Sequence, residues 1–358
     1  MRHRCHIWLA LGLVALVLTA PAALGQMQIK VNDNTWMKFG LLLQTQADAQ
    51  QDPITNAYSQ NVFIRRVRLL LGGQLAPNVT FFVETDSPNL GKSLTTGTKN
   101  VQPSIFLQDA YVEYKFRDAI AIDAGLMLVS PSRNGLQSAA SLLPVDYGAY
   151  TFAQSAATQS SVGRDTGIQA KGYLLGNKLE YRAGVFQGMR DEQNRELRFT
   201  GRVQYDFFDK ENGFFYTGTY LGKKKVLAVG GGIDRQHKYL GYAFDAFLDY
   251  PLKYGAITTQ FDHIRYDGKS FLKSLPDQHD TLFEAGYLIG KTRFQPVVQL
   301  SRRDFSLATG NDEKRYGAGV NYFLSGHNAN IKALYTHVDS RLTDSSRQFT
   351  IQFQFFYY

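Results

Sequence analysis

The last residues of the chain, RQFTIQFQFFYY, alternate between apolar and polar side chains. The apolar frame passes through Phe349, Ile351, Phe353, Phe355 and Tyr357, and most of the positions between them are glutamine or threonine. A period of two predicts a β-strand with one face in an apolar environment and the other face in a polar one. The frame ends on the penultimate residue, one position short of the final aromatic residue.

The same alternation recurs from residue 26 to the C-terminus, and no segment shows the period of an amphipathic helix. Sixteen segments, most of roughly ten residues, follow this pattern, and an even number of such strands is typical of a bacterial outer-membrane barrel. The sequence therefore predicts an all-β protein, a transmembrane antiparallel β-barrel of about sixteen strands. The segments are TWMKFGLLLQTQAD, RRVRLLLGGQL, VTFFVET, DAYVEYKF, IAIDAGLML, GRDTGIQAKGYL, KLEYRAGVFQG, RFTGRVQYDF, VLAVGGGID, YLGYAFDAFLDY, AITTQFDHIRY, TLFEAGYLIG, FQPVVQLSRR, RYGAGVNYFL, NIKALYTHV and QFTIQFQFFYY.

The predicted connections alternate between short and long. LAPN, FRDA, LLGNK and SGHNA are short turns, and the connections between them are longer and polar. This asymmetry is typical of the periplasmic and extracellular ends of an outer-membrane barrel. One connection, residues 208–225, is oversized for the short side, and the sequence offers no explanation for it. The long connections are residues 86–103, 131–162, 188–197, 266–280, 304–312 and 339–346.

Composition adds three points to this interpretation. The mean hydropathy of −0.26 is that of a soluble protein, but a barrel that alternates lipid-facing and lumen-facing residues averages out. Aromatic residues such as Phe116, Phe207 and Tyr250 fall at predicted strand ends, where their rings would form girdles at the two membrane interfaces. The formal net charge of +8 suggests anionic partners.

The first residues have the layout of a secretory signal peptide. Arg2 and Arg4 precede an apolar stretch, and a small-residue cleavage pattern ends at Gly25. Because a spanning helix needs about 20 apolar residues and this stretch is shorter, we expect a cleaved signal peptide, residues 1–25, rather than an anchor. After Sec-type export, residues 26–358 would form the barrel in the outer membrane. The only cysteine, Cys5, lies in the removed segment, so we expect no disulfide.

Several segments resemble the phosphate-selective porin O and P family. They are FIRRVRLLLGG, LQDAYVEYKF, GRDTGIQAKGYL, LEYRAGVFQG and RYGAGVNYFLSGHNANIKALYTHVD. The resemblance extends from Phe39 to the end of the chain, and it depends on the order and spacing of the segments. It implies a sixteen-stranded trimeric porin whose third loop folds into the lumen and narrows it, with basic side chains that guide anions.

Residues 131–162 form the longest connection and the third on the long-loop side, so they are the candidate for an inward-folded third loop. The low charge of this connection and its apolar residues favour packing against the inside of the barrel wall over an external surface loop. Its bases and acids are few, namely Arg133 and Asp146. A phosphate site would need several cationic or amide donors at close range, so this loop is not expected to supply one alone. Its apolar residues include Leu136, Leu142, Leu143, Val145 and Phe152.

Strand alternation assigns seven further bases to the lumen, since a charge facing lipid at mid-bilayer would cost about 2–4 kcal/mol. Arg182 and Arg202 are expected on adjacent strands near mid-depth. Low-dielectric walls would focus the field of such bases on passing anions, and arginine binds phosphate and carboxylate oxygens in a bidentate manner. The alternative is a set of acid-paired side chains with no transport role, because Asp165, Glu180 and Asp206 share the inward frame. With Arg133, the candidate anion-guiding residues are Arg66, Arg68, Arg133, Lys171, Arg182, Arg198, Arg202 and Arg315.

These patterns predict a passive outer-membrane porin that prefers small anions, phosphate among them. We expect a homotrimer in contact with outer-membrane lipid, with no cofactor, no metal and no nucleic-acid partner. The alternative is a non-channel barrel, either an adhesin or structural protein or a hydrolase. Asp262 and His263, or Asp277, His279 and Asp280, could suggest catalysis. No serine has a nucleophile context and no spacing matches a metal motif, so we expect no enzyme.

Overall fold

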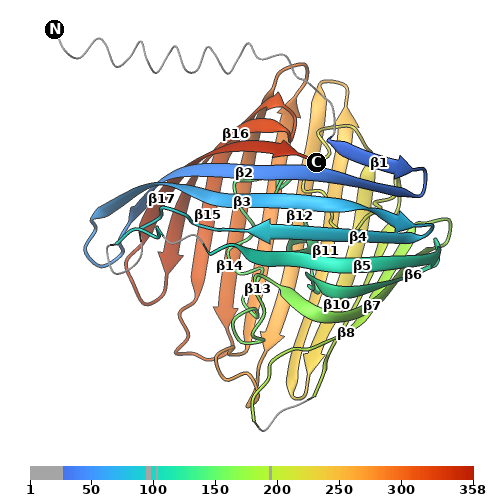
Figure 1. Cartoon of the computed structure of the whole chain (residues 1–358). Coiled ribbons are helices and arrows are strands. Elements are labelled where there is room, and N and C mark those ends of the chain that lie inside the picture. Colours follow the sequence, from blue (N-terminus) through green and yellow to red (C-terminus); the bar gives the residue numbers. More distant parts are fainter. Residues whose placement is uncertain (1–26, 94–97, 102–103, 193–195) are drawn as a thin grey trace.

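The computed structural model describes residues 27–93, 98–101, 104–192 and 196–358. In this part of the chain, sixteen β-strands, β2 to β17, form a closed ring in which each strand is antiparallel to its neighbours (Figure 1). The predicted all-β barrel is therefore confirmed. The predicted signal peptide, with Cys5, lies outside the described residues. Within the same ranges, no helix has the length and apolar character needed to cross a bilayer.

Every one of the sixteen alternating segments in the sequence coincides with a strand of the wall. The strands are β2 (Thr35–Gln51), β3 (Tyr58–Ala76), β4 (Val79–Asp86), β5 (Phe106–Arg117), β6 (Ile120–Leu128), β7 (Arg164–Leu174), β8 (Leu179–Phe186), β9 (Arg198–Asp206), β10 (Val226–Gln236), β11 (Tyr239–Leu252), β12 (Gly255–Asp267), β13 (Gln278–Ile289), β14 (Phe294–Phe305), β15 (Glu313–Ser325), β16 (Ala329–Ser340) and β17 (Ser346–Tyr357).

The ring closes because the last strand pairs with the first long one. The register of β17 on β2 runs from Gln348 opposite Gln50 to Tyr357 opposite Leu41. A short strand, β1 (Gln28–Asn32), forms a hairpin with the start of β2 and continues the same edge beyond the end of β17. Closure leaves the backbone groups of the wall paired, which a strand in lipid requires.

Side chains alternate between an exposed and a buried face, as the period of two predicts. On β17 the Phe353 side chain is 54% exposed and the neighbouring Gln352 is 0% exposed. In a closed barrel the exposed face is the outer one, so apolar rings point outward and amides point inward. The prediction for the closing strand is confirmed.

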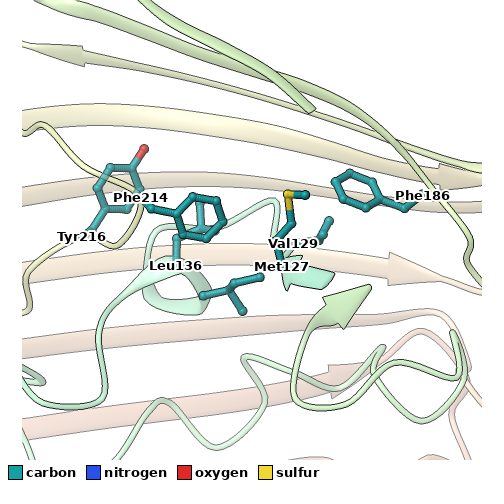
Figure 2. Close-up of a cluster of buried hydrophobic side chains, with 7 residues drawn as sticks. Met127, Val129, Leu136, Phe186, Phe214 and Tyr216 are labelled. Carbon is teal, nitrogen blue, oxygen red and sulfur yellow. The ribbon is translucent and has the colours of Figure 1, made fainter. Parts of the chain in front are cut away.

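The interior of the barrel is filled on one side by two connections, residues 129–163 between β6 and β7 and residues 207–225 between β9 and β10. A cluster of buried apolar side chains marks where they meet the wall (Figure 2). Its labelled members come from the end of β6, from β8 and from both connections, so segments far apart in sequence share one core. They are Met127, Val129, Leu136, Phe186, Phe214 and Tyr216.

Candidate functional site

The connection of residues 129–163 is held by strands on several sides of the ring. Its backbone groups accept from, or donate to, side chains on the buried face of each strand. Because these strands lie around a closed ring, the connection crosses the space that they enclose. A single turn of 3-10 helix, η1 (Asn134–Leu136), lies within it. The strand residues that hold it are Gln44 of β2, Asp245 of β11, Asp262 of β12, Asn321 of β15 and Lys332 of β16.

The connection of residues 207–225 enters the same space from the opposite end of the barrel. The Arg182 guanidinium of β8 donates to the Phe214 carbonyl over 2.9 Å. The Tyr220 amide donates to the Asp249 carboxylate of β11 over 2.8 Å, and the His327 imidazole donates to the Thr219 carbonyl over 2.8 Å. These contacts account for the oversized length that the sequence left unexplained. Its run of aromatic residues, FFYTGTY, is the sequence feature that could have indicated a buried position.

The two connections meet inside the barrel. The Ser138 amide donates to the Tyr216 carbonyl over 2.9 Å, and the Tyr216 amide donates to the Leu136 carbonyl over 3.0 Å. Beside this short parallel bridge, the Arg133 guanidinium binds the Glu211 carboxylate through two nitrogens, one of them at 2.8 Å. Both side chains are buried, so each charge depends on the other for its compensation.

Three cavities follow the other side of the interior. An outer cavity of about 330 Å³ is lined by residues that include Arg65, Arg66, Asp146, Tyr147 and Arg315. A middle cavity of about 90 Å³ is lined by residues that include Arg68, Phe82, Glu84, Arg164, Phe215 and Tyr358. An inner cavity of about 320 Å³ is lined by residues that include Phe82, Tyr111, Lys115, Arg117, Lys171 and Phe214. Their order follows from the direction of β3 and β5, which run from the long-connection end to the short-turn end.

In the outer cavity, one carboxylate bridges two guanidinium groups. Asp146 accepts from Arg65 Nε over 2.9 Å and from Arg66 over 2.6 Å. Although burial favours the neutral acid, the two guanidinium groups hold the pKa of Asp146 well below its usual range. Arg315 binds Glu313 over 2.6 Å. The outer cavity is therefore lined by three bases, and its nearest carboxylates compensate two of them.

Most bases of the other two cavities bind acids of the same part of the barrel, and in the inner cavity Lys115 binds Asp118 of the following turn over 2.8 Å. Arg68 binds Glu84 over 3.1 Å and Asp86 over 2.9 Å. Lys171 binds Glu113 over 2.5 Å and Asp123 over 3.3 Å. Arg164, which the sequence analysis did not single out, binds Asp109 over 3.2 Å.

With this geometry established, comparison with known proteins adds an assignment. The sequence model of the family described as phosphate-selective porin O and P matches residues 39–230. The chain belongs to this family. It is therefore an outer-membrane porin, as the resemblance implied. No curated protein sequence matches the chain.

Solved structures share the fold of this porin at low sequence identity. OmpF of Salmonella typhi, in complex with daunomycin, is 14% identical with a TM-score of 0.62, and the match covers 92% of this chain and 100% of that one. The anion-selective porin from Comamonas acidovorans is 12% identical with a TM-score of 0.62, over 90% and 100% of the two chains. Pseudomonas putida OprB is 9% identical with a TM-score of 0.62, over 90% and 94%. At these identities the likeness concerns the fold alone.

Four of the predicted bases of the porin have structural partners. Three of them belong to or contact the two internal connections, and Arg198 binds Asp165 and Asp234 of the wall. Arg182 and Arg202 do face each other on adjacent strands, as predicted. Arg202, however, binds Asp245 over 2.6 Å and the Pro131 carbonyl over 3.0 Å. None of the four lines the outer, middle or inner cavity in the described part of the chain. They are Arg133, Arg182, Arg198 and Arg202.

Sequence reasoning missed most of the acids that pair with the bases of the porin. Asp165 and Glu180 were named, and they bind Arg198 and Arg182. The others lie on neighbouring strands in the same inward frame, where only the strand register brings base and acid together. They could have been found by listing every acid in the frame of each predicted strand. They are Glu84, Asp86, Asp109, Glu113, Asp123, Asp234 and Asp245.

The residues considered for catalysis are divided between the two faces of the wall. His263 and His279 lie on the outer face, with ring nitrogens 3.4 Å apart, and Asp262 and Asp280 are buried on the inner face. Among the described residues, no group of three or more His, Cys, Asp or Glu side chains is placed to hold a metal ion. The geometry therefore assembles no nucleophile or metal centre from these residues.

Proposed function

We propose that this porin carries small anions by passive diffusion along the side of the interior that contains the outer, middle and inner cavities. The observation that supports this path is the series of cavities itself, each of which is lined by at least two basic side chains. The opposite side of the interior is occupied by residues 129–163 and 207–225. In this proposal the two connections narrow the lumen from both ends and leave a path beside β3, β4, β5 and β7, with β14 to β17 also lining its outer cavity.

The anion-guiding residues of this path are a subset of the predicted ones, with two additions. Arg66, Arg68, Lys171 and Arg315 keep the predicted role. Arg65 and Arg164 join them because each lines a cavity. Arg133, Arg182 and Arg202 instead hold the internal connections and the wall together. Arg198 joins strands of the wall through Asp165 and Asp234.

The anion preference is expected to be moderate, because most of these bases have a carboxylate partner. In the middle cavity Arg68 and Arg164 stand against three acids of β4 and β5. With two bases against three acids the formal charge there is −1, so an oxyanion with two charges would be repelled more strongly than a small monovalent anion. We therefore expect this porin to conduct chloride, and we treat phosphate permeation as a separate question for experiment.

The remaining parts of the functional hypothesis follow from the barrel and from the family. A homotrimer in outer-membrane lipid, exported by a cleaved signal peptide, is the proposed assembly. The exposed aromatic residues of the strands, Phe353 and Phe283 among them, would contact lipid or a second copy. We propose no enzymatic activity for the chain.

Conductance in a planar bilayer tests the proposed function. Purified barrels should give open channels whose reversal potential in a KCl gradient favours chloride, and Arg65→Gln should reduce that preference. Arg265→Gln is a control, because Arg265 also binds aspartate, Asp277 at 2.8 Å and Asp267 at 4.0 Å, but lies on the outer face. An unchanged reversal potential in Arg65→Gln would contradict the path, and block of chloride current by millimolar phosphate would show a phosphate site.

A second function, a barrel that is not a channel, is favoured by one observation. Two internal connections that meet in the interior could close it. Channels that never open under any applied voltage, in barrels that migrate as folded on gels, would support an adhesin or structural role.

A further inference from the structure

The last residue of the chain turns into the barrel, although the apolar frame of β17 faces outward. Phe356 and Tyr358 continue the inward frame that Gln352 and Gln354 begin. The Tyr358 ring lies 3.8 Å from the Lys38 ammonium and packs edge-on against Phe82, with centroids 5.8 Å apart. The C-terminus thus lies beside the start of β2 (Figure 1), with its final side chain on the inner face.

Two glycines on the inner face of the wall make room for this ring. A Cβ atom at Gly72 of β3 would lie 2.0 Å from the Tyr358 hydroxyl oxygen, and one at Gly40 of β2 would lie 2.6 Å from its Cδ2 atom. Non-bonded atoms do not approach this closely. A side chain at Gly72 would therefore displace the ring, and one at Gly40 would displace both the ring and the Tyr357 carbonyl, whose oxygen would lie 2.5 Å from the added Cβ. Glycine within a strand weakens the strand and often marks a close approach of another group. Here the group is the C-terminal tyrosine.

The ring also occupies a particular place along the proposed path. Tyr358 lines the middle cavity, the smallest of the three, together with Arg68 and Arg164. The Phe82 ring lies between Tyr358 and Phe215, which belongs to the connection of residues 207–225. The Phe82 ring centroid is 5.8 Å from the centroid of each of the other two rings. Three rings from the wall, the C-terminus and the connection of residues 207–225 therefore surround the narrow passage.

We propose that Tyr358 is a pore-lining residue that sets the width of the middle cavity, with Gly40 and Gly72 as the surface on which its ring rests. This inference rests on the proposed path. The ring narrows the passage without adding charge. Burial raises the pKa of the Tyr358 phenol to about 12, so it stays neutral at physiological pH. Changes at this residue should therefore alter conductance and leave the preference for chloride unchanged.

Single-channel conductance of four variants tests the assignment. Removing the ring in Tyr358→Ala frees a volume comparable to the middle cavity, so conductance should rise roughly twofold. Tyr358→Phe keeps the ring and should leave conductance unchanged. Gly72→Ala pushes the ring into the passage and should lower conductance, and the double variant Gly72→Ala/Tyr358→Ala should return to the level of Tyr358→Ala. Gly201→Ala is the control for adding a methyl group to a strand, because its Cβ would meet no atom closer than 3.5 Å.

A labelling experiment decides the inference without depending on current. In the variant Tyr358→Cys, a small hydrophilic thiol reagent should react with the folded barrel, and adding Gly72→Ala should change the rate. Heat-modifiable gel migration shows that each variant has folded. A thiol that reacts only after heat unfolding would overturn the inference, as would equal conductance of Tyr358→Ala and wild type. If the wild-type barrel carries no current but the thiol of folded Tyr358→Cys reacts, the proposed function is contradicted while the position of Tyr358 beside the middle cavity stands.

Discussion

Asp146 is the residue whose charge should most directly control selectivity in the outer cavity. It lies on the connection of residues 129–163 and bridges Arg65 and Arg66. It therefore acts as a tethered anion at a place where a passing anion would otherwise bind. Asp146→Asn keeps the shape of the side chain and removes its charge. The two arginines would then present one more uncompensated positive charge to the path.

The size of the effect follows from Coulomb's law. An anion that passes at about 6 Å in water gains roughly 0.7 kcal/mol from one added charge. Screening over a Debye length of about 10 Å in 0.1 M salt leaves roughly half of this, or about 0.4 kcal/mol. The permeability ratio of chloride to potassium should therefore rise about twofold, since about 1.4 kcal/mol corresponds to a factor of ten.

Reversal potentials in a KCl gradient measure this ratio. Asp277→Asn is the control for the loss of one carboxylate charge, because Asp277 binds Arg265 on the outer face and not the two arginines of the outer cavity. The pKa of Asp146 is held far below its usual range, so this charge persists in the folded porin above its lowered pKa. The difference between Asp146→Asn and wild type should then remain at pH 4. Equal reversal potentials for the variant and wild type at pH 7 would refute the assignment of Asp146 to the conduction path.

Three further predictions concern the connection of residues 207–225. Glu211→Gln leaves Arg133 buried without its partner and should destabilise the barrel by about 3–5 kcal/mol, measured by the temperature of the heat-modifiable gel shift. Replacing residues 210–224 by Asn-Gly, a favoured two-residue hairpin turn, should open the interior and raise conductance roughly twofold or more. Burial lowers the pKa of His327 to about 4, against about 6.5 for an unfolded histidine. Burial disfavours the charged imidazole, so the stability linked to His327 is fully present above pH 6.5 and is lost as the pH falls towards 4, a span worth about 3 kcal/mol. The temperature of the heat-modifiable gel shift should therefore fall on acidification to pH 4.

Each of these predictions has its own check. A gel-shift temperature equal to that of wild type in Glu211→Gln would show that the buried pair does not hold the two connections together. If barrels with the replaced loop migrate as folded and have the same conductance as wild type, the connection of residues 207–225 does not narrow the lumen. In His327→Gln the gel-shift temperature should fall less between pH 7 and pH 4 than in wild type, and a pH dependence that this substitution leaves unchanged would assign the effect to another group.

The wall of the barrel could be predicted from the sequence because alternation is a local property. Within each strand the alternation of apolar and polar residues indicates which face contacts lipid. The inward frame of Arg66, Arg68 and Lys171 could therefore be derived one strand at a time. The interior could not be predicted this way. Whether Arg182 faces water, an acid or the carbonyl of Phe214 depends on a connection that enters from thirty residues further along the chain.

The inward turn of the C-terminal residue also depends on contacts that local alternation cannot predict. The sequence places Tyr357 in the lipid-facing frame, and this frame stops one residue before the end of the chain. The structure explains the apparent shift, because Tyr358 belongs to the inward frame and rests on Gly40 and Gly72. Those glycines lie about 290 to 320 residues earlier in the sequence, and their purpose becomes visible only once β17 has paired with β2.

The pairing of nearly every internal base with an acid follows from how this interior is filled. Where two connections exclude water, an uncompensated guanidinium would carry a desolvation penalty of several kcal/mol, so Arg133 and Arg202 need buried carboxylates. Along the three cavities water can screen a charge, and an incomplete match between bases and acids is tolerated there. The same physical constraint thus divides the arginines into a structural set and a set exposed to the path. Selectivity can arise only from the second set, and a change of one charge in the outer cavity is the smallest change that should alter it.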